Sequence, residues 1–385
     1  MKMLNALILL LLVIGQFELM VAAVNRLHAL RIRGPALRWV RDIHEVLIVA
    51  LPLLLAWLVG VGGWRLTLGG GWTDLPWLWT AYLGLCALGS IGFLVSTARF
   101  ARRRVPQAQL GNDSRCVDLA GRLGYRPLAR GPYRMLAGLP GNEIFRIEVS
   151  DKTYRLPRLP KAWDGLSILH LTDLHLIGTI DLPFFEALAD LAAESPADLI
   201  VFTGDLLDDQ RLIDWLPTTL GRMSAPLGCY FILGNHDWYL DPDAIRRQMT
   251  DLGWHDVAGA TRVLTRGDST IAIGGTERPW MGQHPDFTST ATDAFRILLS
   301  HTPDNLGWAR QQKVDLMLSG HNHGGQVVPP IVGPIYAPSL HGCRYISGAY
   351  EAPPTLLYVS RGISGRHPIR WRCPPELTRL ILRSH

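Results

Sequence analysis

Charged residues and paired cysteines are both scarce in this sequence. Asp, Glu, Lys and Arg together make up 18% of the 385 residues, against about 25% in typical soluble domains. The five cysteines are scattered and include no C-x-x-C pair, so neither a disulfide framework nor a thiolate zinc site is expected. Apolar residues reach 48%. This excludes a disordered chain and indicates that part of the protein does not face water.

Three long apolar segments occupy the first quarter of the chain. They span residues 4–24, 43–63 and 75–98, and each exceeds the length of about 20 apolar residues that crosses a bilayer. Glu18 is the one charge in the first segment, and Pro52 interrupts the second. Proline is tolerated in membrane helices because neighbouring groups satisfy the freed backbone. We therefore expect residues 1–104 to form a transmembrane anchor of three helices.

The basic residues lie beside these segments. Residues 1–104 hold 11 Lys and Arg but only 4 Asp and Glu. Two arginine clusters flank the expected spans: Arg26, Arg31, Arg33, Arg38 and Arg41 in the first loop, and Arg99, Arg102, Arg103 and Arg104 after the third span. By the positive-inside rule, both clusters and the large C-terminal part face the cytoplasm, and the short loop between the second and third spans lies outside. A cleaved signal peptide is the rival interpretation, but it would export nine arginines. Because the excess charge is explained by topology, no nucleic-acid partner is expected.

The rest of the chain has an α/β pattern. Residues 105–140 mix Arg, Gly and Pro without periodicity, which predicts a membrane-proximal linker. Short apolar runs then predict strands near residues 145–149, 166–171, 198–203, 230–233, 271–273, 297–299 and 316–318, with helices over 183–194 and 243–252. This alternation predicts a layered α/β domain over residues 141–385.

Polar side chains follow five of these strands. They form the blocks Asp173-x-His175, Gly204-Asp205, Gly234-Asn235-His236-Asp237, His301 and Gly320-His321-Asn322-His323. Ligand sites in α/β sheets gather beyond the carboxyl ends of strands. Carboxylate, amide and imidazole ligands without thiolate suit Mn²⁺, Zn²⁺ or Fe ions, and there are more of them than the about four that one zinc takes. We expect two metal ions with a shared ligand, a site suited to attack by a metal-activated water on phosphorus.

The blocks, in this order, resemble the calcineurin-like metallophosphoesterases. The family pattern D-x-H, G-D-x-x-D, G-N-H-[DE], H and G-H-x-H is matched at residues 173–175, 204–208, 234–237, 301 and 320–323. Residues 159–166, 324–326, 357–362 and 368–376 further resemble the bacterial membrane-linked YkuE/YaeI-like branch. The resemblance covers roughly residues 140–385 and implies a β-sandwich flanked by helices.

The resemblance also implies a role for each motif residue. One metal ion would be held by Asp173, His175 and His323, the other by Asn235, His301 and His321, with Asp205 as the bridge. His236 would be catalytic, as a proton donor or transition-state stabiliser at the leaving group, and Asp237 would orient it. Asp208 would support the bridging loop. Manganese is the favoured metal.

Substrate contacts are less specific in the sequence. After the strand at 271–273, relatives often have a Gly-Val-Asp-Asp-like turn, whereas this chain has residues 274–278, Gly-Gly-Thr-Glu-Arg. The substrate-side loop therefore departs from the family pattern. Arginine forks suit phosphate and aromatic rings suit bases, so the candidate substrate-binding residues are Arg278, Trp280, Arg344, Arg361 and Arg366.

These observations predict a metal-dependent hydrolase anchored in the bacterial inner (plasma) membrane by several spans, with its catalytic domain in the cytoplasm. Its substrate would be an amphiphilic phosphodiester or pyrophosphate. A specific alternative is a UDP-2,3-diacylglucosamine pyrophosphohydrolase of lipid A synthesis. A catalytically silent membrane scaffold is an alternative of another class, but it calls for lost metal ligands, and none is lost. Transport or sensing through the helices has only Glu18 and Gln16 in its favour.

Overall fold

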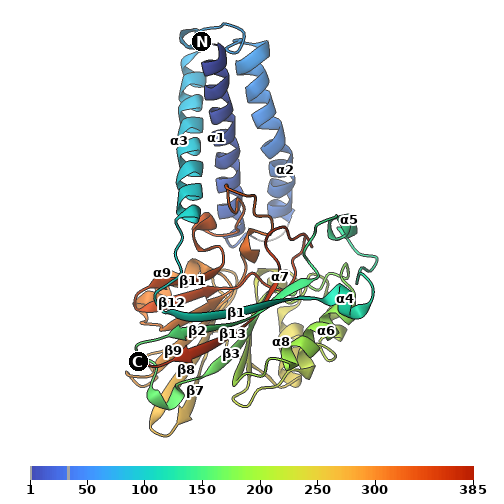
Figure 1. Ribbon diagram of the computed structural model, residues 1–385, viewed down its shortest axis with the longest axis vertical. Helices are drawn as coiled ribbons and strands as arrows, with labels where there is room; N and C mark the ends of the chain where they lie inside the picture. The colour runs from blue at the N-terminus through green and yellow to red at the C-terminus, as the bar shows by residue number, and fades with distance from the viewer. Residues whose placement is uncertain (1, 33–34) are drawn as a thin grey trace. The chain divides into compact units, whose positions relative to one another are not determined.

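The computed structural model describes residues 2–32 and 35–385 (Figure 1). The chain divides into two compact units. The first comprises Met1–Arg103 together with a distant segment, Pro330–Arg344, and the second comprises Arg104–Pro329 and Tyr345–His385.

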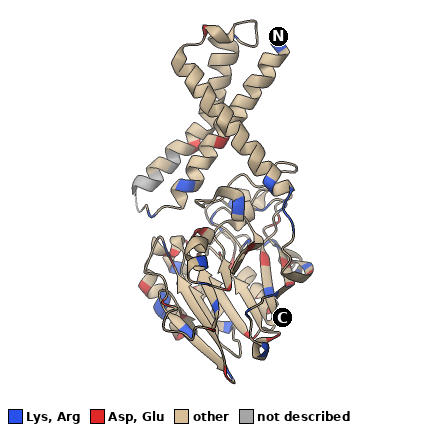
Figure 2. Ribbon diagram, turned by 90° about the vertical axis from the view of Figure 1, so that its left-hand side faces the viewer, with Lys and Arg blue, Asp and Glu red and all other residues tan. Residues whose placement is uncertain are grey.

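Three long helices make up most of the first unit. They are α1 (Lys2–His28), α2 (Pro35–Leu55), which continues as a π-helical turn over Ala56–Gly62, and α3 (Trp77–Ala101). All three are long and apolar enough to cross a membrane, and long tan stretches in Figure 2 show how few charged residues they carry. The expected set of three apolar helices is confirmed. Arg33 and the side chains of Arg38 and Arg41, part of the expected arginine cluster, lie outside the described part of the chain.

Helices α1 and α3 pack through small residues. A Cβ atom on Gly89 would lie 2.2 Å from the carbonyl oxygen of Gly15, so the two backbones approach closely only because glycine stands there. The Ser90 hydroxyl adds a hydrogen bond of 2.6 Å to the carbonyl oxygen of Leu11. Small residues and hydroxyl bonds of this kind are the usual means by which membrane helices associate, since lipid supplies no hydrophobic driving force between them.

The second unit contains two mixed sheets. The seven-stranded sheet has the order β1 (Gln109–Asp118), β2 (Arg146–Arg155), β13 (Glu376–Arg383), β3 (Ser167–Leu171), β4 (Leu199–Thr203), β5 (Cys229–Ile232) and β6 (Trp254–Asp256). The six-stranded sheet has the order β11 (Gly348–Ala352), β12 (Thr355–Val359), β10 (Leu316–Ser319), β9 (Phe295–Ser300), β8 (Ser269–Thr276) and β7 (Thr261–Arg266). Among the helices are α4 (Leu119–Leu123), α5 (Arg134–Gly138), α6 (Leu182–Ala193), α7 (Asn235–Trp238), α8 (Pro242–Asp251) and α9 (Leu306–Gln311).

The two sheets pack face to face, and helices cover their outer faces. Ile168, Val201 and Ile232 belong to a core that also contains inward side chains of the second sheet, such as Ile297 and Leu318. The opposite face of the first sheet packs on α6 and α8, and the outer face of the second packs on α9. Strands β3, β4 and β5 are buried on both faces, which is why they read as continuous apolar runs. The expected β-sandwich flanked by helices is confirmed.

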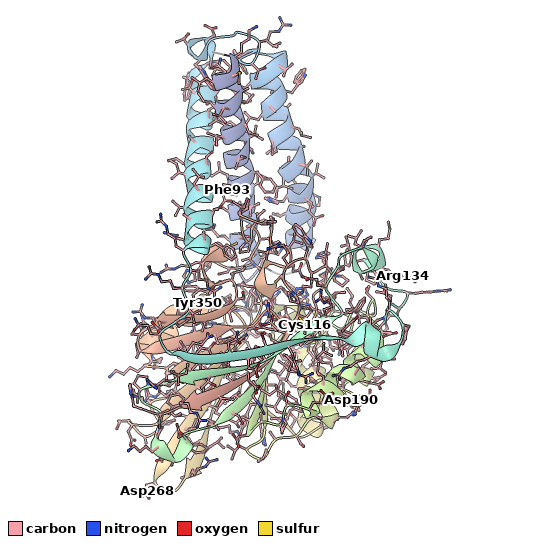
Figure 3. All side chains as sticks on the ribbon, viewed as in Figure 1. Phe93, Cys116, Arg134, Asp190, Asp268 and Tyr350 are labelled. Carbon is pink, nitrogen blue, oxygen red and sulfur yellow. The ribbon has the colours of Figure 1, made fainter. Side chains whose placement is uncertain are left out.

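Residues 105–140, which we expected to be a linker, contain regular structure. They include β1, on which Cys116 is labelled in Figure 3, and the short helices α4 and α5. Strand β1 pairs antiparallel with β2 from Gln109 to Asp118. Because β1 is an edge strand whose side chains are mostly exposed, it lacks the apolar alternation that reveals a half-buried strand. The segment is therefore part of the second unit.

Candidate metal centre

The carboxyl ends of five strands deliver the motif residues to one place. Asp173 and His175 follow β3, Asp205 follows β4, and α7 begins at Asn235 after β5. His301 follows β9, and His321 and His323 follow β10. Neighbouring strands within each of these groups are parallel, so their carboxyl ends lie at the same edge.

Most of these residues have an unusual backbone. Five of the seven expected ligand residues have left-handed φ angles: Asp173 57°, His175 45°, Asp205 58°, His321 68° and His323 49°. Residues other than glycine adopt this region at a cost, and such residues cluster at functional sites where the surrounding structure holds them. The tight turns after the strands are what aim these side chains inward.

The first ligand cluster consists of Asp173, His175 and His323. The Nε2 atoms of the two histidines are 3.2 Å apart. Asp173 Oδ1 lies 3.7 Å from the Nε2 of His175 and 3.6 Å from that of His323. These are separations that a cation between the atoms would bridge. Burial opposes ionisation of Asp173, but the charge of His323 and the hydrogen bond from His175 lower the pKa of Asp173.

The second cluster consists of Asp205, His301 and His321. The amide oxygen of Asn235 joins it, 3.1 Å from His301 Nε2. His301 directs its other nitrogen, Nδ1, to the carbonyl oxygen of Thr203 at 2.8 Å, which leaves Nε2 as the nitrogen available to a metal ion. The Nε2 of His321 is buried and has no hydrogen-bond partner among the described residues. A metal ion would supply the partner that this nitrogen lacks.

Asp205 lies between the two clusters. Its Oδ2 atom is 3.2 Å from His301 Nε2 and 3.5 Å from His175 Nε2, so one carboxylate oxygen faces a ligand of each cluster. Its other oxygen accepts the backbone N–H of His236 at 2.9 Å. Burial disfavours the charge, but the charges of His301, His236 and His175 hold the pKa of Asp205 well below its usual range. The carboxylate is thus ionised and placed to be shared.

Glycines make room for these carboxylates. A Cβ on Gly234 would lie 2.1 Å from Asp205 Oδ1, and one on Gly320 would lie 2.3 Å from Asp173 Oδ2. The donors present are imidazole, carboxylate and amide, and they surround two adjacent positions. The residues therefore fit two divalent metal ions of the Mn²⁺, Zn²⁺ or Fe type.

Asp208 orients two histidines at once. Its Oδ1 accepts a hydrogen bond of 2.5 Å from the Nδ1 of His236, and its Oδ2 accepts one of 2.8 Å from the Nδ1 of His175. In both rings, this leaves Nε2 facing the site. The His236 side chain is 18% exposed, whereas that of His175 is 1% exposed. His236 is therefore the imidazole that an incoming substrate can reach.

Asp237, which we expected to orient His236, has different partners. Its carboxylate accepts the backbone N–H groups of Leu206 and Leu207 at 3.0 Å and that of Gly234 at 2.8 Å. It thereby joins the loop that carries Asp205 to the loop that carries Asn235. Burial and the charge of Asp205 raise the pKa of Asp237 to about 6. The orienting hydrogen bond belongs to Asp208, because the turn after β4 brings that side chain beneath the imidazole.

Two residues that support the ligand loops were not predicted from the sequence motifs. Arg370 is fully buried and donates from Nη1 to the carbonyl oxygen of His323 at 2.9 Å and from Nη2 to that of Ser364. Glu277 accepts the backbone N–H of Leu233 at 2.6 Å and pairs with Arg246. Arg370 lies in the block 368–376, which resembles the YkuE/YaeI-like branch, and Glu277 lies in the turn 274–278, which departs from the family pattern. Their support of the ligand loops is visible only in the tertiary structure.

The expected substrate-binding residues are dispersed. The ring of Trp280 is buried and packs edge-on against His301 and His321, with ring centroids 5.7 and 5.0 Å away. Arg361 forms ion pairs of 3.0 Å with Glu148 and 2.9 Å with Glu376. Arg344 belongs to the unit of the long helices. Substrate binding therefore stays a prediction for all five residues.

Comparisons with known proteins agree with this geometry. The family described as calcineurin-like phosphoesterase matches residues 166–325. The uncharacterized metallophosphoesterase YkuE of Bacillus subtilis (strain 168) is 34% identical over 63% of this chain and 87% of its own length. The phosphodiesterase YaeI of Escherichia coli (strain K12) is 29% identical over 56% of this chain and 81% of its own length. The UDP-2,3-diacylglucosamine pyrophosphatase LpxG of Chlamydia muridarum (strain MoPn / Nigg) is 25% identical over 58% and 85%, respectively.

Proposed function

Since the chain belongs to the calcineurin-like phosphoesterase family, we propose that it is a membrane-anchored, dinuclear-metal hydrolase of phosphodiester or pyrophosphate bonds. One observation carries the proposal. A single oxygen of Asp205 lies 3.2 and 3.5 Å from imidazole nitrogens of two separate ligand clusters. This is the arrangement that a bridging carboxylate needs.

Two bound divalent ions would polarise a phosphoryl oxygen and lower the pKa of a water molecule enough to make it a nucleophile at neutral pH. The chain supplies the rest. Asp173, His175 and His323 would hold one ion, and Asn235, His301 and His321 the other. Asp205 would be the carboxylate that both ions share.

His236 would act at the leaving group. With Nδ1 engaged by Asp208, its Nε2 is free to donate a proton to the departing oxygen or to stabilise charge there. That Nε2 lies 4.0 Å from Asp205 Oδ2, farther from this oxygen than the ligand nitrogens of His175 and His301 are. His236 would therefore act beside the ligand clusters and not as a metal ligand.

The helices support anchoring and an amphiphilic substrate. Three helices of sufficient length and apolar character precede the catalytic unit, and arginines gather at their loop and C-terminal ends. By the positive-inside rule, the catalytic unit faces the cytoplasm of a bacterial cell. A phosphoesterase held at a bilayer meets substrates that reside in it.

A narrower candidate is hydrolysis of UDP-2,3-diacylglucosamine, supported by the similarity to a pyrophosphatase named for that substrate. It is a nucleotide-lipid with a pyrophosphate bond, and it would need both a two-metal centre and access to the bilayer. A silent scaffold is disfavoured, because the candidate ligands are all present around two positions, and all of them except the half-buried His323 are buried.

The proposal is tested by metal analysis and a substrate panel on the full chain purified in detergent. We expect about two divalent ions per chain and Mn²⁺-stimulated hydrolysis of a chromogenic phosphodiester. Release of UMP from UDP-2,3-diacylglucosamine would establish the narrower candidate. A protein that binds metal but hydrolyses neither monoesters, diesters nor nucleotide-lipids would contradict the enzymatic assignment.

A further inference from the structure

Residues 330–344 form an apolar segment that leaves the catalytic unit and joins the long helices. The segment reads Pro-Ile-Val-Gly-Pro-Ile-Tyr-Ala-Pro-Ser-Leu-His-Gly-Cys-Arg and contains no acidic residue. It belongs to the compact unit of the helices although more than 200 residues separate the two in sequence. Ile331, Leu340 and Tyr336 are 91%, 48% and 39% exposed, so large apolar side chains face outward from it.

The segment packs on one end of the helices. The backbone N–H of Ala337 donates to the side-chain oxygen of Asn25, near the C-terminus of α1, at 3.1 Å. The rings of Tyr336 and His28 meet edge to face at 6.1 Å. A Cβ on Gly333 would lie 2.5 Å from the ring of Phe100, near the C-terminus of α3. These are the arginine-rich ends, where Arg26 and Arg99 stand in the last turns.

The backbone of the segment limits how deep it lies. Apart from the short turn at Gly342–Tyr345, it has no helix or strand, and Pro330, Pro334 and Pro338 interrupt it. Irregular backbone exposed to lipid is not tolerated in the hydrocarbon centre, where no water satisfies its polar groups. Irregular backbone is tolerated at the boundary of headgroups and acyl chains, where Tyr and exposed aliphatic side chains are also found.

We propose that residues 330–344 are a lipid-binding element that lies in the headgroup–acyl boundary of the bilayer at the arginine-rich ends of the helices. The occupant of its exposed apolar face is the phospholipid leaflet itself, because the face is continuous with helices that would be surrounded by lipid. This inference rests on the anchoring part of the proposed function.

The element has a consequence for the substrate. Pro330 follows the metal-ligand candidate His323 by seven residues, and seven residues reach at most about 25 Å when fully extended. Wherever the catalytic unit sits, His323 stays within that distance of the leaflet. A phosphoester that keeps its acyl chains in the leaflet and presents its head group at the surface fits this tether.

Site-directed spin labelling in nanodiscs of phosphatidylcholine and phosphatidylglycerol tests the proposal. The background carries Cys116→Ser and Cys343→Ser, and labels are placed at Ile331→Cys and Leu340→Cys. Val263→Cys, exposed on β7 of the catalytic unit, is the matched aqueous control, and Leu85→Cys, exposed on α3, reports the spanning helix. An unfolding temperature equal to that of the background protein shows that each variant is folded.

We expect the ratio of oxygen to nickel-chelate collision rates at positions 331 and 340 to exceed that at 263 several-fold. Water-like ratios at either position, with a lipid-like ratio at 85, would overturn the lipid-binding element while leaving the anchor intact. A water-like ratio at 85 would overturn the anchor and this inference together. Catalytic failure in the substrate panel would leave the collision ratios unchanged.

Discussion

The carboxylate of Asp208 lies 2.5 Å from the Nδ1 of His236 and holds that imidazole with its Nε2 toward the site. Its second oxygen holds His175, a metal-ligand candidate, in the same way. One aspartate thus sets the orientation of the proposed catalytic histidine and of a metal-ligand candidate.

Replacing Asp208 with Asn should lower both turnover and metal affinity. Loss of such supporting partners usually costs about 10- to 100-fold. The amide of Asn has one accepting oxygen where two imidazole Nδ1–H groups now find acceptors, so one of the two rings loses its orienting hydrogen bond. Asp209→Asn is the matched control, since Asp209 pairs with the exposed Arg211. Steady-state kinetics and metal titration measure the effect, and equal behaviour of the two variants would remove the assigned role.

Asp205 and His236 should separate metal binding from proton transfer. Asp205→Ala should abolish activity and deplete bound metal, because the carboxylate shared by both clusters is gone. His236→Ala should retain metal yet reduce turnover by about 10²- to 10⁴-fold, the usual contribution of a positioned acid. Elemental analysis of both proteins beside their rates checks this; equal metal depletion in the two would refute the division of roles.

Metal binding should release protons and strengthen as pH rises. Burial opposes the charge on His301, but the carboxylates of Asp205 and Asp173 outweigh it and raise the pKa of His301 to about 9 in the metal-free protein. Below pH 9 the imidazole must lose its proton before it binds metal. Titration calorimetry with Mn²⁺ at pH 7, in buffers of different ionisation enthalpy, should show proton release. Affinity should rise from pH 6.5 to 8, and His301→Asn should weaken that dependence.

Arg370→Met should loosen the loop of His323. The substitution leaves the buried carbonyl oxygen of Ser364 without its donor, which costs about 1–3 kcal/mol. It also removes one of the donors to the carbonyl oxygen of His323, which keeps the N–H of Gln326, so we expect a lower unfolding temperature and weaker metal binding. Arg372→Met, on the exposed side of the same segment, is the control. If thermal unfolding and Mn²⁺ titration do not distinguish the two variants, Arg370 does not position His323.

Truncation should reveal that the catalytic unit begins before residue 109. Removal of residues 1–103 keeps β1 and should leave hydrolysis of a small chromogenic phosphodiester largely intact in detergent. Removal of residues 1–118 strips β1 from β2 and leaves β2 as an unpaired edge. That protein should unfold at a lower temperature or aggregate. Equal stability of the two truncations would show that β1 is dispensable.

Local patterns in the sequence were enough to predict several features of this protein. The apolar helices were predictable because bilayer-length apolar runs are a property of adjacent residues. The ligand candidates were predictable because each stands directly after an apolar strand, and parallel strands bring their carboxyl ends together whatever the connecting chain does. Matching five such blocks to a known family then implied the β-sandwich.

Features that depend on contacts between distant segments were beyond such patterns. Nothing adjacent to Asp208 or Asp237 indicates which of them reaches His236, since that depends on the turn after β4. The exposed edge strand β1 and the central position of the last strand, β13, follow from pairing with β2 and β3. The association of residues 330–344 with the helices is likewise a matter of packing in space. In each case, the arrangement is stabilised by contacts with residues far away in the chain. Local sequence periodicity does not predict such contacts.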